Sequence, residues 1–330
     1  MPSPRLPWAA LGVAVATLAA TIVLLRGHDS YVLGSIWWGC RGPFALVAVG
    51  LLLWSLRRTS RVVGLVSGAT LGLLIVDTFG GLFSSARPPA EALEQPLRVV
   101  SHNLLFRGNH LDESLAGLRD AGAELIALQE VTPEDAARLT DALRETHPYS
   151  ATAPHPGANG FALFSRHPLA EVSLVRLEGR APIAQCATLE VGGGRLPICN
   201  VHLSAPSKAL NDFKALPDFD GLEQNARRRS TEWSLVERDF ARRGGDRALA
   251  LGDFNSTEAE PLYRSIRHEW VDAFRDLHLD YGATWPHVKH RPPFARIDYV
   301  FTKGRIRASE AQVIRRSGSD HLPIAAELRL

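Results

Sequence analysis

Cysteine is scarce and charge is nearly balanced in this chain of 330 residues. Three cysteines in a chain of this length exclude the small scaffolds that disulfides hold together. The 37 Lys and Arg residues are almost offset by 35 Asp and Glu residues, which excludes the strongly basic composition of a protein that lives on nucleic acid and the acidic composition of a solvating tail. Hydrophobic residues make up 45% of the chain, which is typical of a globular protein with a sizeable core.

The charges are distributed unevenly along the chain. The first 86 residues contain six Arg, no Lys and two acidic residues, a net charge of +4. Residues 87–330 contain 31 basic and 33 acidic residues, a net charge of −2. This difference predicts two parts that lie in different surroundings.

Three long apolar runs occupy the first part, and they cover residues 8–25, 36–56 and 62–83. At 1.5 Å per residue, the first run crosses most of a hydrocarbon core that is about 30 Å thick. The second run includes Arg41, and the third has Gly64, Gly68 and Gly72 at a spacing that lets another helix pack closely. We therefore predict an N-terminal region, residues 1–83, with three transmembrane helices.

The arginines predict how this region is oriented. Arg57, Arg58 and Arg61 crowd the link between the second and third runs, and positively charged links favour the cytoplasm. Three spans then place everything after Phe83 outside the cytoplasm, in a multi-pass protein of the cell membrane. A cleaved signal peptide is the alternative for the first run, but no small-x-small cleavage site follows Leu25.

A single α/β domain is predicted from Leu97 to Leu330, after a proline-containing linker at residues 84–96. Apolar runs predict strands at residues 97–102, 125–128, 161–165, 183–191, 195–203, 248–251, 297–301 and 323–330. Helices are predicted at 111–121 and 225–242, and Thr132-Pro133-Glu134-Asp135 is typical of a helix start. Because both helices and hairpins separate the strands, we expect mixed sheets.

Polar and ionisable residues fall at the ends of these apolar strands. They are Asn103, Glu130, His202, Asp253, Asn255, Asp298, Asp320 and His321. Each has an ordinary explanation by itself, because a carboxylate after a strand often caps a turn and a histidine there is often a hydrogen-bonded surface residue. Together they predict a polar rim over an apolar core, which is how α/β enzymes build their sites.

In this order and beside these strands, the set resembles the endonuclease/exonuclease/phosphatase superfamily, the group of pancreatic deoxyribonuclease, apurinic endonucleases, neutral sphingomyelinases and inositol polyphosphate 5-phosphatases. Residues 159–169 and 282–286 resemble further segments of that family. One departure is His102, where many relatives have tryptophan or tyrosine before the asparagine. The resemblance implies a four-layer α/β sandwich with two facing mixed β-sheets and a site at their common end, here preceded by the three-helix transmembrane region.

The resemblance also implies a divalent-metal-dependent phosphoesterase. Glu130 is the expected ligand for Mg²⁺ or Mn²⁺, hard cations that take only one or two carboxylates. Asn103 and Asp320 would complete the metal site, and Asn103 and Asn255 would also contact the substrate. Zinc is not expected, because the sequence has no Cys/His quartet with tetrahedral ligand spacing.

The catalytic residues implied by the resemblance are His202, Asp253, Asn255, Asp298 and His321. His321, oriented by Asp298, would polarise water or contact the scissile phosphate, and His202 would donate to the phosphoryl or leaving oxygen. Asp253 competes with His321 for the role of general base, and the sequence leaves both open.

The expected substrate is a phosphoester: a phospholipid, a small phosphoester or nucleic acid. The transmembrane helices would add the lipid bilayer as a partner, and no protein partner is inferable. A catalytically inactive, membrane-tethered binding or sensor domain is the alternative function. Such domains commonly lose ligands, whereas all eight positions here carry chemically competent residues.

Two other features leave alternatives open. Cys186 and Cys199 lie on either side of a glycine turn, and a hairpin that pairs Glu190 with Arg195 also pairs the cysteines, so a disulfide and two buried thiols are both compatible with the sequence. The run Arg227–Arg229 either presents a basic face to a phosphorylated substrate or forms the solvated side of the helix at 225–242.

Overall fold

The computed structural model describes residues 6–26, 30–58, 60–84, 96–108, 110–206, 218–278, 280–288 and 292–330. The chain divides into an N-terminal helical unit and a larger unit that begins at Arg87. Most of the predicted linker, residues 85–95, lies outside the described residues.

The N-terminal unit consists of three helices, α1 (Leu6–Arg26), α2 (Tyr31–Arg58) and α3 (Arg61–Ser84). Gly64 of α3 lies against Ser55 of α2, where an added Cβ would come within 2.9 Å of the serine hydroxyl. At Gly68 and Gly72 no atom lies within 4 Å of such a Cβ, so the predicted smooth face packs at one of its three glycines.

Fewer candidate transmembrane helices are present among the described residues than predicted. Among the described residues one helical segment, Trp8–Leu25 of α1, is long and apolar enough to cross a membrane. The apolar part of α3, Arg61–Val76, is shorter. In α2, Arg41 and Pro43 leave an uninterrupted apolar run of only 13 residues, 44–56, where a span needs about 20. The side chains of residues 31–42 and 77–84 lie outside the described set.

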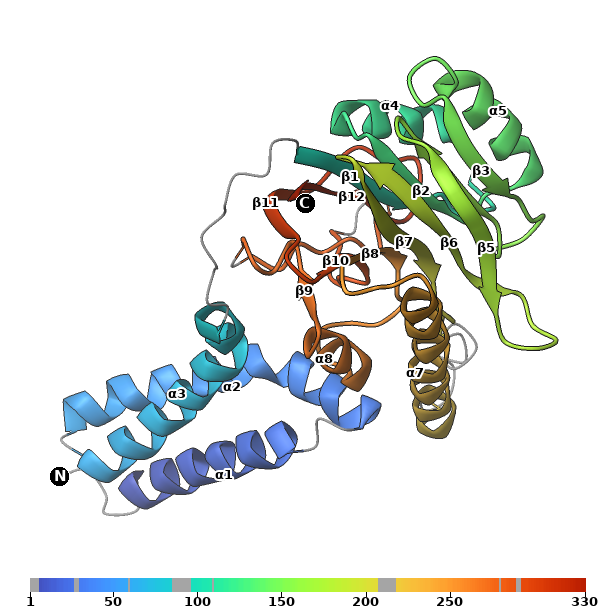
Figure 1. Cartoon of the computed structure of the whole chain (residues 1–330). Coiled ribbons are helices and arrows are strands. Elements are labelled where there is room, and N and C mark those ends of the chain that lie inside the picture. Colours follow the sequence, from blue (N-terminus) through green and yellow to red (C-terminus); the bar gives the residue numbers. More distant parts are fainter. Residues whose placement is uncertain are drawn as a thin grey trace. The chain divides into compact units, whose positions relative to one another are not determined.

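The larger unit is built on two six-stranded sheets (Figure 1). The first sheet has the order β11 (Arg307–Val313), β12 (Ile324–Arg329), β1 (Pro96–Asn103), β2 (Leu125–Gln129), β4 (Phe161–Ser165), β3 (Tyr149–Ala153). The second has the order β5 (Leu169–Arg176), β6 (Pro182–Val191), β7 (Gly194–His202), β8 (Ala248–Asp253), β10 (Asp298–Lys303), β9 (Trp270–Asp272). In each sheet one central pair is parallel, β1 with β2 and β7 with β8, and the other pairs are antiparallel. The prediction of mixed sheets is confirmed.

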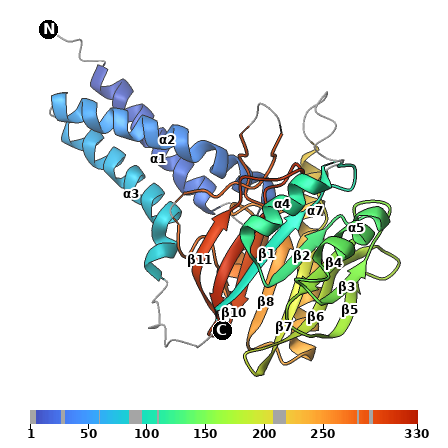
Figure 2. The ribbon, with the colours of Figure 1, turned by 90° about the horizontal axis from the view of Figure 1, so that it is seen from above.

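The central strands are apolar on both faces because both faces are covered. In β2, Leu125 and Ala127 join the core between the sheets, which also contains Leu249 and Leu251 of β8. The alternate residues of β2, beginning with Ile126, join a second core with α4 (Leu111–Ala121) and α5 (Pro133–Leu143). Helix α7 (Phe219–Arg242) lies beside β5, β6 and β7 of the second sheet (Figure 2). The short α8 (Pro261–Arg267) follows β8 in the chain. The unit is the α/β sandwich that the resemblance implies.

The four strands that the sequence did not predict, β3, β5, β9 and β11, are the edge strands of the two sheets. An edge strand is covered less completely, and β3, β5 and β11 carry exposed residues in place of an apolar run. The fourth, β9, has only three residues. The predicted strands form the interior of both sheets.

A capped helix start fixes the chain just after the end of β2. The Thr132 hydroxyl accepts a hydrogen bond from the Asp135 backbone N–H at 3.1 Å, the Asp135 carboxylate accepts from the Thr132 backbone N–H at 3.3 Å, and Pro133 occupies the first turn. The predicted helix start is therefore confirmed. It leaves Glu130 in the tight bend between β2 and α5.

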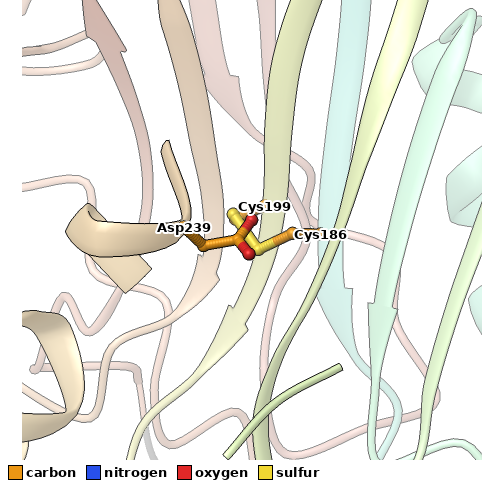
Figure 3. Close-up of side chains that lie close together, drawn as sticks. All are labelled: Cys186, Cys199 and Asp239. Carbon is orange, nitrogen blue, oxygen red and sulfur yellow. A yellow bond between two sulfur atoms is a disulfide. The ribbon is translucent and has the colours of Figure 1, made fainter. Parts of the chain in front are cut away.

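Cys186 of β6 and Cys199 of β7 lie directly opposite each other and form a disulfide (Figure 3). The register pairs Glu190 with Arg195, as the hairpin pairing predicts. Asp239 of α7 approaches the sulfurs, and its carboxylate accepts hydrogen bonds from Arg242 and Arg243. These three residues do not form a thiolate metal site, because disulfide sulfurs carry no thiolate.

Candidate active site

The predicted polar residues come from both sheets and meet at one end of the sandwich. Asn103 is the last residue of β1, and Glu130 follows β2, its parallel neighbour. In the second sheet His202 and Asp253 end the parallel strands β7 and β8 and lie opposite each other in the register. Asp298 begins the antiparallel strand β10 and pairs with Asp253. The strand pairing therefore brings these side chains together.

Asn103 joins the two sheets. Its Nδ2 donates to Glu130 Oε1 at 3.1 Å and to Asp253 Oδ2, which lies 150 residues away in the sequence, also at 3.1 Å. Its Oδ1 accepts from the Leu105 backbone N–H at 3.0 Å, which fixes the orientation of the amide. The other Glu130 oxygen, Oε2, accepts from the Phe106 backbone N–H at 3.1 Å. The predicted metal and substrate residue of β1 thus contacts one carboxylate from each sheet.

Two of these residues have backbone angles that non-glycine residues rarely adopt. Glu130 has φ of 58° and Asn255 has φ of 49°. Nearby, Gly252 has φ of 149°, and an added Cβ would come within 1.9 Å of the Val201 carbonyl oxygen. Only glycine fits this close approach of β7 and β8. Rare backbone conformations of this kind concentrate at functional sites.

Asn255 holds the Asp253 carboxylate in place. Its backbone N–H donates to Asp253 Oδ1 at 2.8 Å, and its side-chain Nδ2 donates to Asp253 Oδ2 at 3.2 Å and to the Leu203 carbonyl at 3.0 Å. Both hydrogens of the Asn255 side-chain amide are therefore donated to neighbouring protein groups. The structure shows how Asn255 positions Asp253.

His321 and Asp298 form the expected pair. Nδ1 of His321 lies 3.0 and 3.2 Å from the two carboxylate oxygens of Asp298, and Nε2 lies 3.8 Å from Asp253 Oδ2. All three side chains are buried. The imidazole therefore stands between two carboxylates, with its Nε2 toward Asp253.

Burial and charge shift the pKa values of this group in opposite directions. Burial raises the pKa of Asp253 to about 6, although the neighbouring His321 opposes the rise. Burial lowers the pKa of His321, but the carboxylates of Asp298 and Asp253 outweigh this effect and raise it to about 10. His321 is accordingly a cation at neutral pH.

This cation makes the stability of the domain depend on pH. The pKa of His321 is about 10 in the folded protein and ordinarily 6.5, so its stabilising effect is complete below pH 6.5 and is lost as the pH rises toward 10. The shift corresponds to as much as about 5 kcal/mol of unfolding free energy. We measure urea unfolding of the full-length protein at pH 7, 8 and 9, in buffer that contains a metal chelator. The urea midpoint should fall steadily as the pH rises, and it should fall much less in His321→Gln.

A matched control for this titration is His147→Gln. His147 is also buried, but burial lowers its pKa, so it does not titrate above pH 7. This variant should keep the wild-type slope. Equal slopes in wild type and His321→Gln would contradict the assignment of the cation.

The side chains of His202 and Asp320 make no hydrogen bond to the other predicted site residues in the part of the chain that the structure describes. His202 Nε2 is 3.7 Å from both Glu130 Oε1 and Asp253 Oδ2, and its ring packs edge-on against Phe161. The Asp320 carboxylate accepts from Trp285 Nε1 at 3.2 Å. Among the described residues Asp320 makes no hydrogen bond or ion pair with Asn103 or Glu130. Its place in the metal site stays a prediction.

The donor atoms fit a hard divalent cation. Glu130 offers carboxylate oxygens, and Asp253, Asp298 and His321 offer ligand atoms within 4.8 Å of one another. Asn103 faces Glu130 with its Nδ2, a donor, and its Oδ1 is the atom that could serve as a ligand. Carboxylate and amide oxygens are the ligands that Mg²⁺ and Mn²⁺ prefer. The end of the sandwich therefore has suitable donors on both sides of Asn103.

The sequence predicts no role for His102, but in the structure this residue contacts the segment that carries His321. It is fully buried, and its Nε2 lies 2.9 Å from Ser317 Oγ and 3.3 Å from the His321 carbonyl oxygen. Burial, reinforced by the positive charge of His321, lowers the pKa of His102 to about 4, so it is neutral. The available signal was a histidine directly before Asn103 in an otherwise apolar strand.

A family model described as the Endonuclease/Exonuclease/phosphatase family matches residues 100–321. No curated protein sequence matches the chain. The similar solved structures include an endonuclease/exonuclease/phosphatase from Beutenbergia cavernae, with 23% identity, coverage of 72% of each chain and a TM-score of 0.55.

Two further solved structures have the same fold. TDP2 of D. rerio in complex with a single-strand DNA product is 14% identical, with 72% of this chain and all of that chain covered and a TM-score of 0.56. The human nocturnin catalytic domain with a bound sulfate is 19% identical, with 71% of this chain and 94% of that chain covered and a TM-score of 0.55. At these identities the likeness shows the fold alone.

Proposed function

Because the chain belongs to the endonuclease/exonuclease/phosphatase family, which the match over residues 100–321 shows, we propose that it is a divalent-metal-dependent phosphoesterase. Members of this family are usually hydrolytic nucleases or phosphatases. The observation that carries the proposal is the junction at Asn103, which places Glu130 of one sheet and Asp253 of the other within 3.1 Å of one amide nitrogen. The alternative, an inactive binding domain, is disfavoured because this junction and the His321–Asp298 pair are intact.

Glu130 and Asn103 would hold Mg²⁺ or Mn²⁺, with Asp320 as a further candidate ligand. The bound cation would neutralise charge on the phosphoryl oxygens and favour attack by water. Asn103 would contact the substrate phosphate as well, and Asn255 would do so in addition to positioning Asp253.

The proton transfers are assigned from the charges of the site. A cationic His321 does not accept a proton, so we assign the general base to Asp253, whose pKa of about 6 lets it be ionised at neutral pH and still accept a proton from water. His321, oriented by Asp298, stabilises the phosphoryl oxygens, and His202 donates to the phosphoryl or leaving oxygen. We therefore propose Asp253, and not His321, for the general base that the sequence leaves open.

The deciding experiment is a substrate panel with the full-length protein in detergent. Hydrolysis of DNA, sphingomyelin, inositol phosphates and bis(p-nitrophenyl) phosphate is measured with Mg²⁺, with Mn²⁺ and with excess chelator. We expect turnover of at least one substrate that disappears with the chelator. Failure to hydrolyse any of them would support an inactive binding domain instead.

We place the substrate among small phosphoesters or phospholipid headgroups. Single-stranded DNA is bound by TDP2 and is the other candidate, but residues 87–330 of this chain carry a net charge of −2. Binding to a long nucleic acid depends mainly on neutralising its phosphates with basic residues. The charge of the domain therefore favours a compact substrate.

We further propose that the helical unit anchors the protein in a membrane, with the catalytic domain outside the cytoplasm. The length and composition of Trp8–Leu25 support the anchor, and the disulfide supports a domain outside the cytoplasm, since disulfides persist in oxidising compartments. Alkaline phosphatase fused after Leu330 should be active, and green fluorescent protein fused there should be dark. A bright, phosphatase-inactive pair after Leu330 would reverse the orientation.

A further inference from the structure

A pocket with a volume of about 350 Å³ lies beside the candidate active site, within the α/β unit. Glu130 and His202 contribute to its lining, so the pocket adjoins the reacting groups. Its other walls come from the loops after β3, β5 and β7 and from α7, including Arg180 and Arg228. A substrate bound at Glu130 would extend into this space.

The three consecutive arginines of α7 have three different environments. Arg227 is exposed, Arg228 is half-buried and lines the pocket, and Arg229 is fully buried and donates to the Ser204 carbonyl and to Asn225. Successive residues of an α-helix point about 100° apart, which separates their directions. The interpretation as the solvated side of the helix therefore fits Arg227, and Arg228 is the one of the three that lines the pocket.

Arg228 is incompletely paired. Its Nε is buried without a hydrogen-bond partner, and the nearest carboxylate oxygen, Glu232 Oε1, is 4.0 Å away. Glu232 is buried and accepts instead from the backbone N–H of Ser204, at 2.9 Å, and from the Ser204 hydroxyl. A buried donor of a cation without a partner is unfavourable. Arg228 therefore has one guanidinium donor, Nε, for which the described residues provide no acceptor.

We propose that Arg228, assisted by Arg180, binds a second phosphate group of the substrate next to the phosphate that is hydrolysed. The guanidinium group suits phosphate because its planar donors match two oxygens at once. A pocket of this size holds a small molecule. The substrate class is thus a small ester with at least two phosphates, either free or as a lipid headgroup. This inference rests on the proposed function.

The test compares inositol 1,4-bisphosphate with inositol 1-phosphate, which differ by one phosphate. Binding to the full-length protein is measured by calorimetry, and inhibition of bis(p-nitrophenyl) phosphate hydrolysis is measured in parallel. We expect the bisphosphate to bind about 10- to 100-fold more tightly, because each hydrogen bond to a charged group contributes strongly. Vesicles with phosphatidylinositol 4-phosphate or phosphatidylinositol distinguish a lipid source from a free one.

Arg228→Gln should abolish this preference and leave the affinity for the monophosphate within about twofold. Arg228→Lys should retain part of it, and Arg227→Gln, which changes an exposed neighbour on the same helix, should retain all of it. If Arg228→Gln does not fold, Arg180→Gln provides a second test, since Arg180 is exposed and its loss should lower the preference by a smaller factor.

An equal preference in wild type and Arg228→Gln, or no preference in the wild type, would overturn the inference. A purely structural role for Arg228 would weaken the binding of both phosphates alike. Because calorimetry needs no turnover, binding with the expected Arg228 dependence but without hydrolysis would reject the proposed function alone. Hydrolysis without that dependence would reject only the second phosphate site.

Discussion

His321→Ala should lower turnover by about 100- to 1,000-fold, the range that one preorganised donor to a negatively charged oxygen contributes. The imidazole is the cation of the site, held by Asp298 at 3.0 Å and facing Asp253 at 3.8 Å. Asp298→Asn should cost less, because the ring stays in place but loses the carboxylate that stabilises its charge. The double variant should be hardly slower than His321→Ala, since groups that act as one unit lose function non-additively.

The measurement is kcat for the four proteins on the best substrate of the panel, with unfolding midpoints recorded for each. A charge-based role also predicts that Asp298→Asn lowers the pKa of His321, so its alkaline loss of stability should begin at lower pH than in wild type. Losses that simply multiply in the double variant would mean that the two residues act independently.

Glu130→Gln should remove most of the metal-dependent activity, by about 100-fold or more, while the protein stays folded. Glutamine keeps a carbonyl oxygen that can still accept from Asn103 or from the Phe106 backbone N–H, but it loses the negative charge that a hard divalent cation requires. Activity is measured against increasing Mg²⁺ and Mn²⁺. The variant should need far more metal or stay inactive at saturation.

Glu134→Gln is the matched control, because this exposed glutamate lies in the first turn of α5, four residues away. It should have wild-type metal dependence. Wild-type activity that survives exhaustive chelation would reject the assignment of Glu130 altogether.

The sequence predicted the interior of the fold well because central strands are covered on both faces. Their apolar runs are visible in the sequence. A polar residue at the end of such a run lies where the strand leaves the core, at the rim of the sheet. The edge strands were missed for the complementary reason, since their exposed residues resemble those of loops. The prediction of three transmembrane helices failed where Arg41 and Pro43 shorten the apolar run of α2.

The sequence predicted which residues form the site better than it predicted how their side chains are arranged. The hydrogen bond from Asn103 to Asp253 joins residues of different sheets, and no local pattern encodes how two sheets face each other. The directions of the Glu130 and Asn255 side chains depend on positive φ angles. Because neither residue is glycine, the sequence gives no sign of this backbone conformation. The contact of Asp320 with Trp285 and the contacts of His102 with Ser317 and His321 also join residues distant in the sequence, so only the structure shows them.

The first and last strands of the domain lie side by side, with Ser101 of β1 opposite Ile324 of β12 in the middle of the first sheet. A ribosome makes β1 first and β12 last, and His321 precedes β12 by only three residues. A nascent chain therefore cannot close this sheet or bring His321 to the site until β12 has emerged. The candidate site is therefore completed late in the synthesis of the domain, and a chain that stops before β12 should lack both the closed first sheet and the full set of site residues.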